Sequence, residues 1–175
     1  MFKHLLVPTD GSALSDAALQ MAVALAKEHS ANLTVLHVIP EFHMFTSDAE
    51  MLGDTKERFQ QVAQQHAEAF LAAATAIAQH AGVECEAISL TEAHAHEAII
   101  DVATRRNCDL IVMASHGRSG ARALLIGSET QKVLTHSDIP VLVVRPPKSL
   151  QPRNETTPGA TGAPRQSRNP PFISL

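Results

Sequence analysis

The residues with the clearest chemical potential lie between positions 114 and 128, where the sequence is ASHGRSGARALLIGS. Gly117 lets the backbone turn sharply and approach a ligand closely. Gly127 and Ser128 stand where a helix is expected to begin, and the free backbone amides at such a position bind anions. A structural alternative stays open, because Ser128 and Gln131 fit a helix-capping box without any ligand. The segment matches neither the GxxxxGK[ST] nor the GxGxxG phosphate-binding motif.

Asp10 is a second candidate for ligand binding, because it lies just after the apolar run Leu5–Val7. Its carboxylate can accept a hydrogen bond from a hydroxyl or an amine of a ligand. The same carboxylate can instead cap a helix that begins after Ser12, or stabilise the turn before that helix. Considered alone, Asp10 fits the structural role better; considered together with the glycine segment, it fits ligand binding.

Several other polar residues leave more than one role open. His116 is placed either to contact a phosphate or shuttle a proton, or to bond the loop backbone. Arg118 and Arg122 could either neutralise the charge of a phosphate or face the solvent on a loop. His94 and His96 are separated by one residue, a spacing that directs side chains apart on a helix. No third metal ligand is evident near them, so no metal site is predicted.

Secondary structure must position these residues, and hydrophobic periodicity predicts alternating strands and helices. The expected strands are residues 3–8, 32–39, 83–90, 109–114 and 140–144, and the expected helices are residues 13–25, 54–81, 95–106 and 128–136. This order predicts an α/β fold, a single-domain, doubly wound, five-stranded parallel sheet. Ligands in such sheets bind beyond the carboxyl ends of the strands, so residues 9–10, 38–39 and 114–117 are expected to meet at one crevice.

Two sets of residues are expected to serve only the core. The helix over 54–81 opens with a capping box of Asp54 and Glu57, and its apolar stripe is predicted to face inward. That stripe comprises Phe59, Val62, His66, Phe70, Ala73 and Ile77. Cys85 and Cys108 belong to no CxxC pair, so both are predicted to be buried, reduced thiols.

Composition divides the chain into a domain over residues 1–145 and a proline-rich tail over 146–175. The tail holds seven prolines and an excess of three positive charges, which predicts a disordered extension that is either solvated or partner-binding. The whole chain has a net charge of −4, so it lacks a broad basic field for nucleic acid. No apolar run approaches the roughly 20 residues of a membrane helix and no signal peptide is evident. A cytoplasmic protein without a membrane partner is therefore predicted.

The glycine segment resembles the G-x2-G-x9-G-[S/T] motif of the universal stress protein family, with Ala114 standing at the first glycine position. The resemblance covers about residues 2–145. It also includes LVPTDGS at 6–12, LHV at 36–38 and PVLVVR at 140–145. Alanine adds only a methyl group, and at negative φ it keeps a strand-end conformation at little steric cost. The resemblance implies the fold that this family shares with the adenine nucleotide alpha hydrolases.

The resemblance also implies which residues hold a nucleotide. In nucleotide-binding members of the family, the acidic residue after the first strand and the end of the second strand hold the nucleoside. The glycine segment holds the phosphates. Carried over by position, the adenine and ribose site is Pro8, Thr9, Asp10 and Val38, the ribose–phosphate contacts are Ala114 and Gly117, and the phosphate ligands are Gly127, Ser128 and the amide of Glu129.

Three functions are consistent with these residues. The first is an ATP-binding stress or regulatory module that binds ATP or another adenine nucleotide with Mg²⁺, and hydrolyses ATP slowly if at all. The second is a nucleotide-free dimeric signalling or scaffold protein of the same fold. The third, an ATP-cleaving transferase, is disfavoured because residues 8–12 do not match its SGGxDS loop. The first two imply a homodimer through the strand over 141–144, and an unidentified regulatory partner stays open.

Overall fold

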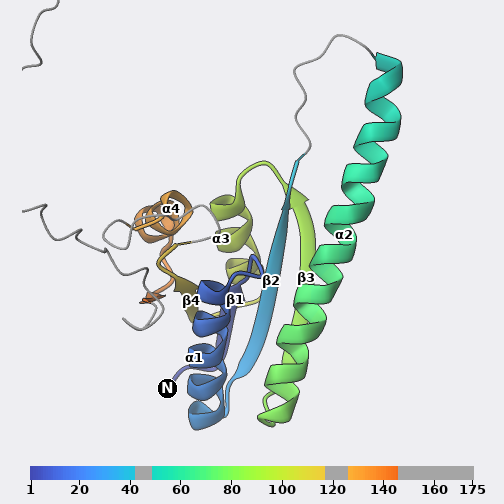
Figure 1. Cartoon of the computed structure of the whole chain (residues 1–175). Helices are drawn as coiled ribbons and strands as arrows, with labels where there is room; N and C mark the ends of the chain where they lie inside the picture. Colours follow the sequence, from blue (N-terminus) through green and yellow to red (C-terminus); the bar gives the residue numbers. More distant parts are fainter. Residues whose placement is uncertain (42–48, 117–125, 146–175) are drawn as a thin grey trace, which may run out of the picture.

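The computed structural model describes residues 1–41, 49–116 and 126–145, with residues 49–55 described by their backbone alone. Along these residues strands and helices alternate (Figure 1). Their bounds are His4–Pro8 (β1), Ala13–His29 (α1), Asn32–Pro40 (β2), Ala49–His80 (α2), Cys85–Glu92 (β3), Ala95–Arg105 (α3), Leu110–Ala114 (β4), Ser128–His136 (α4) and Val141–Val144 (β5). The strands form one parallel sheet in the order β3-β2-β1-β4-β5. The predicted α/β fold with its five-stranded parallel sheet is confirmed.

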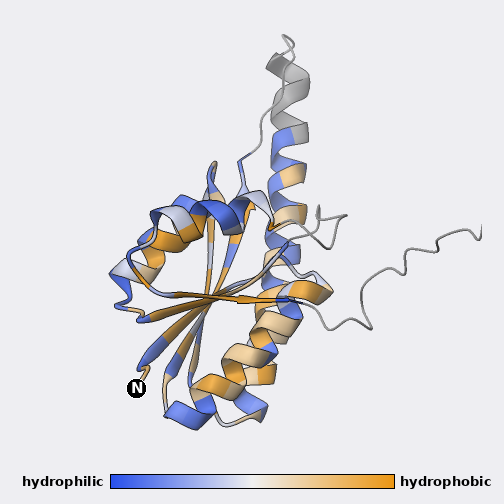
Figure 2. Ribbon diagram, turned by 90° about the vertical axis from the view of Figure 1, so that its left-hand side faces the viewer, coloured by the Kyte–Doolittle hydropathy of each residue, from blue (hydrophilic) through white to orange (hydrophobic). Residues whose placement is uncertain are grey.

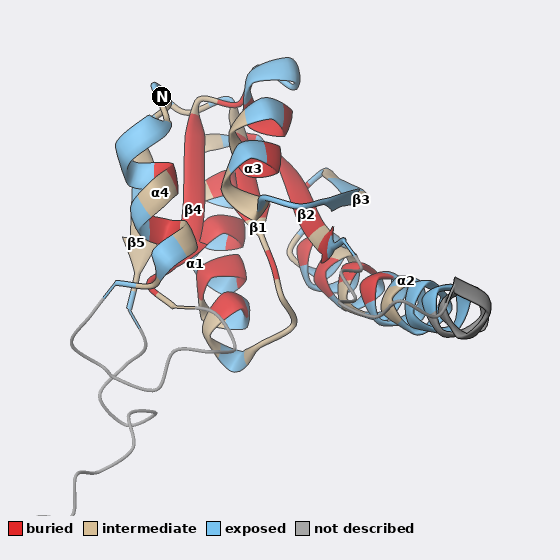
Figure 3. Ribbon diagram, turned by 90° about the horizontal axis from the view of Figure 1, so that it is seen from above, coloured by how far each residue is buried: buried red, intermediate tan, exposed pale blue. Residues whose placement is uncertain are grey.

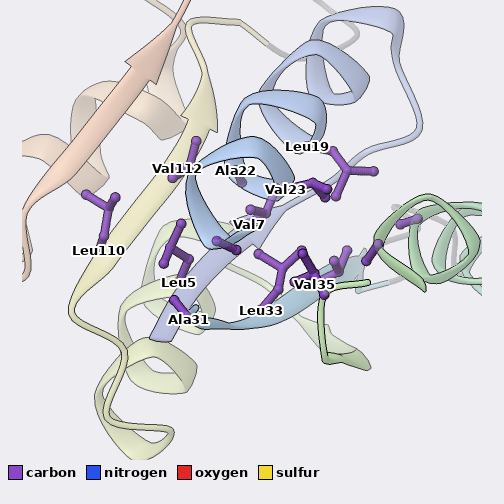
Figure 4. Packing of buried hydrophobic residues seen from close by; sticks show 14 of the residues in the cluster. Leu5, Val7, Leu19, Ala22, Val23, Ala31, Leu33, Val35, Leu110 and Val112 are labelled. Atoms are coloured by element: carbon purple, nitrogen blue, oxygen red, sulfur yellow. The ribbon is translucent and has the colours of Figure 1, made fainter. Parts of the chain in front are cut away.

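β1 lies in the middle of the sheet, and its alternating side chains supply a hydrophobic core on each face. Leu5 and Val7 pack on the face covered by α1 and α2 (Figure 4). Leu6 packs on the opposite face with Ile99 of α3 and Val133 of α4. Helices therefore cover both faces of the sheet, which is why β4 is apolar along its whole length and β1 is apolar from Leu5 to Pro8.

The ends of β3 differ from the prediction. We expect this strand over 83–90 from the sequence, but it runs from Cys85 to Glu92. β3 pairs residue by residue with β2, from Leu33 opposite Cys85 to Pro40 opposite Glu92. The partner strand sets the length of β3, because each strand residue gains its hydrogen bonds from the neighbouring strand.

Helix α2 departs from the prediction both in its start and in its buried face. It begins at Ala49, ahead of the expected capping box at Asp54. Its buried residues among those described are Ala67, Leu71, Ala74 and Ala78. The predicted inward stripe is wrong, since Phe59, Val62 and Ile77 are 38%, 51% and 37% exposed.

The reason for this difference is the position of α2 beside the sheet. Its N-terminal turns extend past the strand ends (Figures 1 and 2), and none of its described side chains before Ala67 is buried. Where α2 does cover the sheet, the buried Ala74 and Ala78 belong to the same core as Val35 of β2. Phe59 and Val62 lie on the N-terminal part of α2 and are exposed, although both are bulky and hydrophobic, so hydrophobicity alone does not predict burial here.

β4 is buried along its full length (Figure 3), because it lies between β1 and β5 with helices over both faces of the sheet. Just before it, Cys108 is buried, and burial raises the pKa of its thiol to about 11, so the thiol stays protonated at neutral pH. Cys85 is half-buried, and burial raises the pKa of this thiol as well. The prediction of a buried thiol is confirmed for Cys108 and wrong for Cys85.

Some predictions concern residues that the structure does not describe. The tail over 146–175, Gly117, Arg118 and Arg122 all lie outside the described ranges. Within those ranges, no helix combines the length and the apolar character that crossing a bilayer requires.

Candidate functional site

A pocket of about 560 Å³ opens at the carboxyl ends of β1, β2 and β4, next to the start of α4. The predicted site residues that line it are Pro8, Thr9, Asp10, Val38, Ala114, Gly127, Ser128 and Glu129. Gly117 is the one predicted site residue that lies outside the described residues. Three segments far apart in the sequence thus meet where parallel sheets bind their ligands. A second, open hollow of about 460 Å³ lies between α2 and the ends of β2 and β3, and no predicted site residue lines it.

The turn between β1 and α1 is held by a network of hydrogen bonds. The Thr9 amide donates to the carbonyl oxygen of Leu36 at 2.8 Å, and Nδ1 of His37 donates to the carbonyl oxygen of Thr9 at 2.8 Å. The carboxylate of Asp10 accepts from the amide of Ser12 at 3.0 Å. Asp10 therefore stabilises its turn, as the structural alternative predicts, and it also lines the pocket. The two roles are compatible because a carboxylate accepts several hydrogen bonds.

Gly11 is required by the shape of this turn. Its φ is +72°, a left-handed conformation that favours glycine. A Cβ at this position would also collide with the ring of Phe70 on α2. The Phe70 ring lies 5.4 Å from the ring of His37, so α2 and β2 meet beside the turn at Gly11. This contact fixes the position of the turn relative to the sheet.

Ala114 ends β4 without any backbone strain. It is not among the described non-glycine residues with positive φ, which are Ser30 and Asn107. Its carbonyl oxygen accepts a hydrogen bond from the hydroxyl of Thr130 at 2.9 Å. The backbone at this position therefore does not need glycine, and alanine fits it.

The backbone amides that are available to a ligand at the start of α4 differ from those expected from the sequence. The amide of Gly127 donates to the carbonyl oxygen of Ser115 at 2.8 Å, so it is occupied. The amides of Ser128 and Glu129 belong to the first turn of the helix, whose amides have no acceptor within the helix. The expected anion site at the N-terminus of α4 therefore rests on these two amides rather than on that of Gly127.

The carboxylate of Glu129 joins α4 to the beginning of α3. One oxygen accepts from the amide of His96 at 2.9 Å and from its Nδ1 at 3.1 Å, and the other accepts from Nζ of Lys132 at 2.8 Å. Burial on its own raises the pKa of this carboxyl. The hydrogen bonds from Lys132 and His96 outweigh burial, so the pKa lies below its ordinary value.

Replacing Glu129 by glutamine is expected to lower the free energy of unfolding at pH 7 by less than about 1 kcal/mol, because water screens partly exposed ion pairs. Because the pKa of the Glu129 carboxyl is lowered in the folded state, its ionised form stabilises the protein at pH values above the ordinary pKa of 4.5. That contribution is lost as the pH falls through the folded-state pKa. Urea unfolding between pH 7 and pH 3.5 measures it, with Glu28→Gln on the exposed face of α1 as control. A wild-type advantage that grows on acidification would contradict this assignment.

His94 and His96 lie closer together than their spacing suggests. His94 is the N-cap of α3 rather than a helical residue, and the two rings are 5.9 Å apart. The expectation that the side chains point apart is therefore wrong. Across the described ranges, no group of three or more His, Cys, Asp or Glu residues could hold a metal ion.

Sequence comparison places the chain among known proteins. A family model described as the universal stress protein family matches residues 1–145. The chain belongs to the universal stress protein family. It is 37% identical over 149 residues to the universal stress protein YxiE of Bacillus subtilis, a match that covers 83% of this chain and 100% of that relative.

Solved structures agree with this membership. The structure of the hypothetical protein MJ0577 matches with a TM-score of 0.74 at 27% identity, over 85% of this chain and 99% of the other. A universal stress protein solved in complex with cAMP matches with a TM-score of 0.60 at 26% identity, over 82% of this chain and 97% of the other. At least one neighbour of this fold therefore binds an adenine nucleotide.

In this universal stress protein, the structure adds residues that our sequence reasoning does not assign to the site. Leu36 and Met113 line the pocket beside the predicted residues, and Thr130 lines it from the first turn of α4. The alternation of β2 could have indicated Leu36, because it shares a face with Val38. His37 lies on the other face of β2 and does not line the pocket, but its hydrogen bond to the carbonyl oxygen of Thr9 holds a residue that does. Only the folded structure reveals this contact.

Proposed function

We propose that this universal stress protein binds an adenine nucleotide, ATP in particular, and acts in the cytoplasm as a nucleotide-responsive stress or regulatory module. The observation that carries the proposal is the convergence of eight predicted site residues on one pocket. Its volume of about 560 Å³ falls within the range of small-molecule sites. The related structure with cAMP supports the ligand class.

The lining of the pocket suits the two halves of a nucleotide. Apolar side chains of Leu36, Val38 and Met113 offer a surface for the adenine ring. The Asp10 carboxylate offers an acceptor for a hydroxyl or an amine of the nucleoside. At the other end, the amides of Ser128 and Glu129 and the Ser128 hydroxyl offer donors for phosphate oxygens.

Magnesium would be held mainly by the phosphates of the nucleotide, as is usual for Mg²⁺ sites. The Asp10 carboxylate lines the pocket and would add an oxygen ligand to the ion. We propose a binding protein rather than an efficient enzyme. Its regulatory output would come from occupancy of the pocket, which joins β1, β2, β4 and α4.

Homodimerisation through β5 is part of the proposal. β5 is an edge strand, its Leu142 is 37% exposed, and the other three residues of the strand are only half-buried. Edge strands of this kind pair with another chain or are protected by other devices. A nucleotide-free dimeric scaffold would use the same edge, so dimerisation does not distinguish the two functions.

The nucleotide content of the purified protein distinguishes the ATP-binding module from the nucleotide-free scaffold. We expect protein purified without added nucleotide and then denatured to release an adenine nucleotide, and we expect purified apo-protein to bind ATP saturably in calorimetric titrations with and without Mg²⁺. A protein that releases no nucleotide and gives no saturable heat with ATP would instead be the nucleotide-free scaffold. A titration with GTP serves as the control for selectivity toward adenine.

A further inference from the structure

His116 carries a buried polar atom that has no partner. The residue lies two positions after the end of β4 and lines the nucleotide pocket. Its Nδ1 lies 3.1 Å from the hydroxyl of Ser115. Its Nε2 is buried and has no hydrogen-bond partner within the part of the chain that the structure describes. Buried polar groups in native proteins are nearly always hydrogen-bonded, so an unsatisfied one calls for an explanation, such as a bound ligand.

The backbone beside His116 is held firmly, and this limits the positions open to the ring. Ser115 is 2% exposed, and its amide donates to the carbonyl oxygen of Val144 on β5 at 2.9 Å. Its carbonyl oxygen accepts from the amide of Gly127 at 2.8 Å. His116 is therefore adjacent to the start of α4, where the amides of Ser128 and Glu129 offer donors to an anion.

The hydrogen bond between Ser115 and Nδ1 of His116 determines whether Nε2 donates or accepts a hydrogen bond. If the Ser115 hydroxyl donates to Nδ1, the proton of the neutral imidazole is on Nε2, which then acts as a donor. The reverse arrangement makes Nε2 an acceptor, and an ionised phosphate has no proton to give it. The form in which Ser115 donates to Nδ1 leaves an Nε2–H donor, which suits an anion beside α4.

We propose that Nε2 of His116 donates a hydrogen bond to a phosphate oxygen of the bound nucleotide, with Ser115 as the residue that orients the ring and fixes its proton. This inference rests on the proposed nucleotide binding and adds a phosphate ligand to it. His116 and the first turn of α4 then contact the same phosphate group from two sides. The pocket would thereby recognise a nucleotide in preference to the nucleoside.

The test compares ATP with adenosine. His116→Phe keeps a ring of similar shape and removes the donor, and we expect it to raise the Kd for ATP about 10- to 100-fold, the loss typical of a hydrogen bond to a charged group. The Kd for adenosine should stay unchanged, because adenosine has no phosphate. His116→Gln, which keeps a side-chain N–H donor, should retain more ATP affinity than His116→Phe. His80→Phe, at the exposed end of α2, is the matched control.

A spectroscopic signature separates direct contact from a structural role. Long-range ¹⁵N–¹H spectra of the His116 imidazole should show the Nε2-protonated form when ATP is bound. Equal ATP affinity of wild type and His116→Phe would overturn the inference while leaving the proposed function intact. A parallel loss of adenosine affinity would also overturn it, because the contact would not be with phosphate. Wild-type protein that binds no ATP would overturn the proposed function itself, together with this inference.

Discussion

Replacing Gly127 by valine is expected to weaken ATP binding by about 100-fold or more, because it obstructs two charge-assisted hydrogen bonds worth about 1.5–3 kcal/mol each. Gly127 is the N-cap of α4 and lines the pocket. Its φ of −60° and ψ of 151° are open to any residue, so valine fits the backbone. The branched side chain would stand beside the amides of Ser128 and Glu129, where the phosphate is expected. Calorimetric titration with ATP measures the effect.

The control for this substitution must change α4 without touching the pocket. Leu134 is 42% exposed on α4 and does not line the pocket, so Leu134→Val should leave ATP affinity unchanged. Circular dichroism should show that both variants keep the helical content of wild type. If Gly127→Val binds ATP as tightly as wild type does, the start of α4 is not the phosphate site. Gly127→Ala, with its smaller side chain, should show a weaker effect of the same kind.

Replacing Leu6 by alanine is expected to lower the free energy of unfolding by about 3 kcal/mol, within the range found for buried leucines. Leu6 is 0% exposed on the middle strand of the sheet. It packs in the core that also contains Leu36, Ile111 and Val133. Removing its side chain takes away buried hydrophobic contacts and leaves a cavity that strands on both sides prevent from closing. Urea unfolding at a fixed protein concentration measures the change.

The matched control is Met21→Ala on α1. Met21 is 45% exposed, so its truncation should change the free energy of unfolding by no more than about 0.5 kcal/mol. Similar losses for the two variants would contradict the assignment of Leu6 to the central core. Leu6 does not line the pocket, so ATP affinity of folded Leu6→Ala protein should stay close to that of wild type.

The order of elements could be predicted because it depends on local patterns. Short apolar runs bounded by turn residues indicate strands, and Ser12 fits an N-cap by its side chain alone. The structure confirms that cap, since the Ser12 hydroxyl accepts from the amide of Ser15 at 3.2 Å. α2 shows the limit of this reasoning. Periodicity indicates a helix, but two stripes of that helix are apolar, and only the neighbouring sheet determines which stripe is buried.

Part of the candidate site could likewise be predicted from the sequence, and part of it could not. Asp10, Val38 and Ser128 could be assigned because residues that follow parallel strands meet at one edge of the sheet. Hydrogen bonds between distant segments could not be assigned from spacing. The Gly127 amide binds Ser115, and the Glu129 carboxylate binds His96, although the sequence offers no sign of either pairing. These bonds change which amides are available to a phosphate.

The sequence by itself determined the α/β alternation, the family resemblance and the segments that supply the pocket, because each of these depends on residue types at short spacing. The tertiary structure alone decided the buried face of α2, the amides left available at α4 and the unsatisfied Nε2 of His116. These features depend on which groups from distant segments come within hydrogen-bonding or packing distance. Such proximity arises only when the chain folds, and it cannot be predicted from the spacing of residues along the sequence.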